Sequence, residues 1–188
     1  MDAHQKKFLM DVLFSNTLMA TVQHVPIYSP DSSEQEKEEF RADLRTRLDE
    51  IVEDYARGNQ VTEEAHIQSI EKLSKDLSFA HPNALKNRRF RIGTAQKALN
   101  LYLKYLWCIG EIDEPPHCPF DSQIIAKLPN YNGPCFTKLD RIEDYRALVE
   151  AAKNFVEATK DPGRGSSLAT WELRKWNEPA CDEGGKEQ

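Results

Sequence analysis

The segment from about residue 94 to 109 constrains the fold most, because apolar side chains would cover most of its circumference as a helix. Its apolar residues at helical spacing are Ala95, Ala98, Leu99, Leu101, Tyr102, Leu103, Tyr105, Leu106 and Ile109. A helix that is apolar on so many sides normally lies at the centre of a bundle, where other helices cover it. The sequence therefore predicts a central helix at 94–109.

The rest of the chain has the same helical spacing, and it lacks the alternating pattern that is typical of strands. Ser33 and Glu36 have the spacing of a capping box, which favours a helix start there. We expect the first helix to be apolar enough to lie in the core, with Phe8, Val12 and Met19 among its apolar residues. The predicted helices besides the central one are roughly 3–23, 33–58, 62–81 and 140–159, with a short one after residue 167. The predicted fold is an all-α, single-domain bundle of about five to seven helices.

A proline-rich segment follows the central helix. Residues 110–134 contain five prolines, which predict an ordered loop with a short helical turn at about 121–128. We expect one domain over residues 1–178 and a disordered polar tail over 179–188. No stretch approaches the ~18 apolar residues of a membrane span, and four cysteines are too few for a disulfide framework. We therefore expect a cytoplasmic protein with reduced thiols and no membrane contact.

The main functional clue is a window without acidic residues. No Asp or Glu occurs between Asp76 and Glu111, although the whole chain has 31 acidic and 25 basic residues. Six Lys and Arg residues give this window +6, so the chain's net charge of −6 leaves −12 for the rest. An anion can bind to such a basic island without local repulsion.

The window predicts an anion-binding groove at 86–104. Polar residues of the central helix fall within one arc about 100 degrees wide, and arginines precede its N-terminus, where unpaired N–H groups favour anions. Gly93 would permit close approach of a ligand and Thr94 could cap the helix. The predicted ligand-binding residues are Arg88, Arg89, Arg91, Gln96, Lys97, Asn100 and Lys104. The predicted ligand is a phosphoanion or a nucleic acid. Nucleic-acid binding is predicted to be local, because a pI of about 5.4 argues against broad duplex binding.

Three other interpretations fit the same residues. The polar strip could simply face solvent and pair with the acids of the second helix. The basic island could dock on an acidic protein surface, including that helix in a second copy, which would make a homodimer. Amides such as Gln96 and Asn100 either line a wet groove or join a polar network, because burying them without partners is costly.

The segment around His117 offers a weaker hypothesis. His117 and Asp121, facing Lys97, could act on a phosphoester as a base and phosphate stabilisers. Cys108, His117, Cys118 and Cys135 lack the paired spacing of zinc ligands, so the sequence predicts no metal site and no cofactor. Cys118 is predicted to be a small packing residue, and His117 is predicted to bond a backbone carbonyl.

Overall fold

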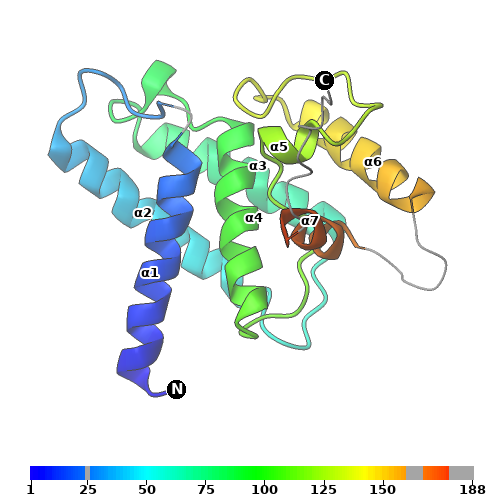
Figure 1. Cartoon of the computed structure of the whole chain (residues 1–188). Coiled ribbons are helices and arrows are strands. Elements are labelled where there is room, and N and C mark those ends of the chain that lie inside the picture. The colour runs from blue at the N-terminus through cyan, green and yellow to red at the C-terminus, as the bar shows by residue number, and fades with distance from the viewer. Residues whose placement is uncertain (24–25, 160–166, 178–188) are drawn as a thin grey trace, which may run out of the picture.

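The computed structural model describes residues 1–23, 26–159 and 167–177, and these form seven α-helices without a strand (Figure 1). This confirms the all-α prediction. The predicted tail at 179–188 lies outside the described residues. The elements in chain order are α1 (Ala3–Val22), α2 (Glu34–Glu53), α3 (Glu63–Ala80), the 3₁₀ turn η1 (Lys86–Arg88), α4 (Ile92–Cys108), α5 (Ser122–Ile125), α6 (Ile142–Ala158) and α7 (Leu168–Asn177).

Helix α4 is the central element, as predicted. It contacts α1, α2, α3 and α6, and twelve of its 17 residues are buried. Figure 1 shows it in the middle of the bundle, with α1 on one side and α6 on the far side. Because the core includes residues of every helix, the groups that α4 carries at its ends and along its sides are fixed by packing from several directions.

The starts of α2 and α3 follow directly from their sequences. Ser33 caps α2 by accepting from the Glu36 amide, while the Glu36 carboxylate accepts from the Ser33 amide, which completes the predicted capping box. Thr62 caps α3 by accepting from the amide of Ala65. Along α2, the side chains of Phe40 and Leu44 are completely buried in the bundle.

Helix α1 meets only in part the expectation that its apolar residues lie in the core: Leu13 is in the core, and Leu9, Leu18 and Val22 pack against it. Phe8, Val12 and Met19 are 71%, 38% and 61% exposed, whereas Thr17 and Thr21 are buried. The threonines can be buried because each hydroxyl donates to a carbonyl one turn earlier in the same helix, at 2.9 and 2.7 Å. The side of α1 that packs inward is therefore partly polar, and an apolar side remains exposed.

The loop after α4 is ordered around a short helix. Asp121 accepts hydrogen bonds from the amides of Gln123 and Ile124, each at 3.0 Å, and so starts α5 within the predicted turn. Gly110, with φ 78°, turns the chain away from the end of α4. No helix among the described residues is both long and apolar enough to cross a membrane.

Candidate functional site: a basic pocket at the start of helix α4

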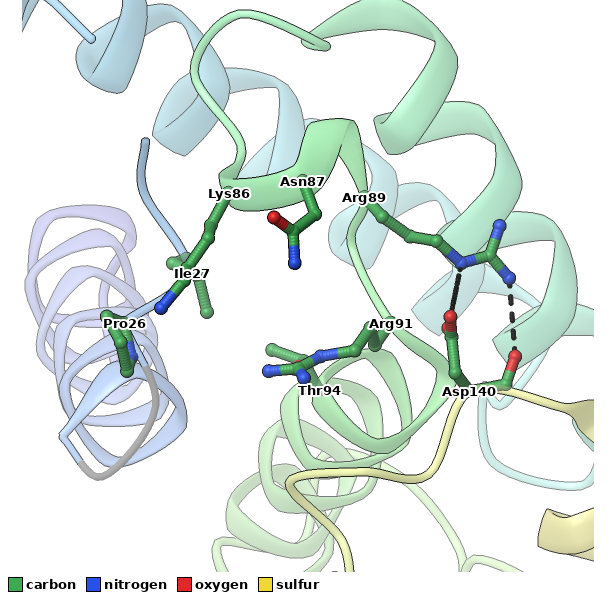
Figure 2. Close-up of a pocket in the computed structure, with 8 residues that line it drawn as sticks. All are labelled: Pro26, Ile27, Lys86, Asn87, Arg89, Arg91, Thr94 and Asp140. Carbon is green, nitrogen blue, oxygen red and sulfur yellow. Dashed lines mark hydrogen bonds and ion pairs between the residues drawn. The ribbon is translucent and has the colours of Figure 1, made fainter. Parts of the chain in front are cut away.

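A pocket of about 270 Å³ lies between residues 26–27, η1 and the start of α4 (Figure 2). Two backbone hydrogen bonds fix its outer wall. The amide of Lys86 donates to the Ile27 carbonyl at 2.7 Å, and the amide of Ser29 donates to the Ala84 carbonyl at 2.9 Å. The residues that line the pocket are Pro26, Ile27, Lys86, Asn87, Arg89, Arg91, Thr94 and Asp140.

An unusual backbone turn directs these side chains. Asn87 and Arg88 both have left-handed conformations, with φ of 55° and 57°. Asn tolerates this region, but for Arg it costs about 1 kcal/mol or more. Lys86 and Asn87 line the pocket, whereas Arg88 lines a separate hollow with Asp31 and Glu36. The turn thus separates two neighbouring cations, and Arg88 is not part of this pocket.

Two cations of the pocket are uncompensated. Within residues 1–23, 26–159 and 167–177, neither Lys86 nor Arg91 forms an ion pair or a side-chain hydrogen bond, and both reach into the space that Figure 2 shows. Arg89 instead turns aside to Asp140, where its Nε lies 2.7 and 2.8 Å from the two carboxylate oxygens. Lys86 and Arg91 therefore supply the pocket's net positive charge.

The N-terminus of α4 contributes less than the sequence suggested. Arg91 occupies the capping position without a side-chain cap, and Thr94 is not the cap. The amide of Gly93 already donates to the Leu139 carbonyl at 2.8 Å, and that of Thr94 to the Arg91 carbonyl at 3.0 Å. The close approach at Gly93 is made by the backbone of Phe136, not by an open ligand space. Attraction for an anion in this pocket thus comes mainly from side chains.

The predicted amides of α4 do not line a groove. Gln96 and Asn100 are both fully buried. The Gln96 Nε2 donates to the Phe120 carbonyl at 2.7 Å, and its Oε1 accepts from the Phe120 amide at 3.1 Å. The Asn100 Nδ2 donates to the Cys118 carbonyl at 2.9 Å. These two residues join a polar network, which was the alternative to a wet groove, and they tie the proline-rich loop to α4.

Two buried histidines extend this network. His66 lies between the Tyr55 hydroxyl, 2.6 Å from its Nδ1, and the Asn100 Oδ1, 2.8 Å from its Nε2. His117 contacts the Tyr145 hydroxyl at 2.8 Å through Nδ1, and its buried Nε2 has no hydrogen bond. Burial lowers the pKa of each histidine to about 3, and the neighbouring His117 contributes for His66. Both side chains are therefore neutral at pH 7.

The predicted lysines of α4 lie elsewhere again. The Lys104 ammonium is 2.7 Å from the carboxylate of Glu172 on α7, so it pairs with an acid, though not with one on the second helix. Lys97 is only 7% exposed and lines a cavity between α4 and α7. The predicted ligand-binding residues are thus divided among the basic pocket, the separate hollow of Arg88, the buried network and this second cavity.

The residues of the phosphoester hypothesis do not share one site. Lys97 and Asp121 line the same cavity, but His117 is fully buried in the network and bonds a tyrosine hydroxyl instead of the expected carbonyl. Cys118 is buried, as predicted, and burial raises the pKa of its thiol. No three His, Cys, Asp or Glu side chains gather into a metal-binding group in the described part of the chain.

Lys86, Asn87 and Thr94 complete the pocket, although they were not among the predicted ligand-binding residues. Lys86 lies inside the acid-free window, so its charge could have assigned it to the pocket from the sequence. No feature of the sequence assigns Pro26 and Ile27 to the pocket, because their position depends on a long-range pairing of residues 27–29 with 84–86. Comparison of the chain with protein-family models, curated proteins and solved structures found no match.

Proposed function

We propose that the protein binds a phosphate-bearing ligand in the basic pocket. The observation that supports this is the pair of uncompensated cations, Lys86 and Arg91, that face one cavity. A guanidinium can donate two parallel hydrogen bonds to a phosphate, and an ammonium adds a point charge. Asn87 and Thr94 supply further donors at the same wall. This set of donors, with one neutralised Arg–Asp pair beside it, suits one or two phosphate groups.

The size of the pocket favours local binding of one group over tracking along a nucleic acid. Binding to a polynucleotide backbone requires a row of cations, each neutralising one phosphate. Here the cavity is about 270 Å³ and Arg88, the next exposed cation, lines a different hollow. The phosphate could be free or carried by a nucleotide or an oligonucleotide end. Titrations with pyrophosphate, AMP and a short 5′-phosphorylated oligonucleotide distinguish these sources.

The matched variants Arg91→Gln and Arg88→Gln test the proposal, because each removes one arginine charge. We expect Arg91→Gln to weaken pyrophosphate binding about ten-fold, which is the usual worth of a charge-assisted hydrogen bond. Arg88→Gln should change the affinity less than about two-fold, since its charge is outside the pocket and is screened by solvent. Isothermal titration calorimetry at low salt measures both. Equal losses in the two variants, or no binding by the native chain, would contradict the proposal.

A protein-interaction role is a second candidate, and a different observation favours it. Phe8, Val12 and Met19 are exposed at spacings of four and seven residues, so they share one side of α1. An exposed apolar strip of this kind is typical of a contact surface. This observation favours α1, and not the basic window, as a surface for a protein partner or a second copy of the chain.

A further inference from the structure

A second cavity, of about 450 Å³, lies between α4 and α7. The end of α1 and the start of α5 complete its walls. Leu101 and Tyr105 from α4, with Leu173 and Trp176 from α7, contribute apolar surface to it. This size and this lining are typical of small-molecule sites, which are mostly apolar with a few polar groups.

Lys97 is the distinctive polar group of this cavity. Lys97 is only 7% exposed as a residue, and its ammonium, which is not fully sealed from solvent, makes no hydrogen bond or ion pair with any residue that the structure describes. It lies 5.0 Å from the centre of the Phe136 ring. Buried charged groups are nearly always paired, because removing them from water is costly. Burial lowers the pKa of Lys97, and Asp121 opposes this only in part.

The other charges of the cavity restrict what could pair with Lys97. Lys104 is neutralised by Glu172, whose own pKa is raised by burial. The carboxylate of Asp121 accepts two backbone amides of α5 and still carries a negative charge into the wall. Two carboxylates beside a single unpaired cation disfavour a dianion such as phosphate, because like charges repel. A singly charged acid pairs with Lys97 and meets only about half of that repulsion.

We propose that this cavity binds a small organic monoanion, a carboxylic acid with an apolar body. Its carboxylate pairs with the Lys97 ammonium, and its body packs between Leu101, Tyr105 and Trp176. Trp176 is 60% exposed at this position, and the Lys104 ammonium lies 5.3 Å from its ring centre, so the indole is available to cover a ligand. This site is separate from the basic pocket and differs from it in ligand chemistry.

Octanoate and 3-phenylpropionate are suitable probes, with octanamide and octylamine as the uncharged and cationic counterparts of the first. We expect saturable binding of at least one acid by calorimetry, about ten-fold tighter than octanamide, and no binding of octylamine. Lys97→Met keeps the length and packing of the side chain but removes its charge, and it should weaken binding of the acid about ten-fold. Arg91→Gln, in the basic pocket, should leave it unchanged.

The melting temperature shows whether the Lys97→Met variant is folded, and we expect it to match or exceed that of the native chain because a buried charge has been removed. Three results would overturn the proposal: no saturable binding of either acid, equal affinity for octanoate and octanamide, or full octanoate affinity in a folded Lys97→Met protein. Weakened pyrophosphate binding in Arg91→Gln with octanoate binding retained separates this site from the proposed phosphate site.

Discussion

Lowering the pH from 7 to 5 should reduce the free energy of unfolding by about 4 kcal/mol, or about 2 kcal/mol for each of His66 and His117. Both histidines are buried, and burial lowers the pKa of each to about 3. In the unfolded chain the pKa of each histidine returns to about 6.5. Below that pH the unfolded state therefore binds protons that the folded state does not bind. Stability is therefore fully present above pH 6.5 and is lost as the pH falls toward 3.

Chemical denaturation at pH 7, 6 and 5 measures this loss. Burial raises the pKa of Glu172, so any uptake of a proton there favours the folded state and opposes the loss. The pKa of Glu64 is lowered to about 2 by Arg146, so its contribution disappears only below about pH 4.5. Replacing both histidines with Gln should lower stability at pH 7, because Asn100 and Tyr145 lose partners, but it should flatten the pH dependence. An unchanged free energy of unfolding between pH 7 and 5 in the native chain would contradict the buried network.

Gly93→Ala should destabilise the fold by about 3 kcal/mol or more, which is at the upper end of overpacking costs. A Cβ at this position would lie 1.9 Å from the carbonyl oxygen of Phe136 and 3.1 Å from the Leu139 Cβ. The first of these atoms is backbone, so it cannot move without shifting the 135–139 loop. Intrinsic propensity alone would favour Ala in a helix by about 1 kcal/mol, so the sign of the change separates the two effects.

The control is Gly58→Ala, which has no atom within 4 Å of its added Cβ but has φ +88°. It should lose only about 1 kcal/mol, the cost of the left-handed backbone. Urea unfolding of both variants measures the difference. A Gly93→Ala protein as stable as the native chain would show that the loop is not seated on α4 as described.

The helices and their starts could be predicted because they depend on local sequence. The apolar circumference of α4 and the cap at Ser33 involve residues within a few positions of one another. The exposed strip of α1 could not be predicted in this way. Its apolar residues are spread around the helix, and which side packs on α4 depends on where Thr17 and Thr21 fit.

Part of the basic pocket lies in the region that the sequence singled out, for a related reason. The acid-free window contains Arg91 and Lys86, which line the pocket, since charge is visible in the sequence. The burial of Asn100 in a polar network could not be predicted, because its partners His66, Cys118 and Tyr145 come from three distant segments. Likewise, the neutralisation of Lys104 depends on Glu172, which is 68 residues away. Spacing along one helix defines a face but not what covers it.

The affinity of an Asp140→Asn variant for pyrophosphate tests the central claim most directly, because the claim predicts a gain and not a loss. This change removes the only carboxylate that lines the basic pocket among the described residues and releases Arg89 from its ion pair. We expect binding about five-fold tighter than in the native chain, from one less repulsive charge near the ligand. Glu143→Gln, an exposed acid outside the pocket, is the control and should change the affinity less than two-fold. An unchanged or weaker affinity in Asp140→Asn would contradict phosphate binding in this pocket.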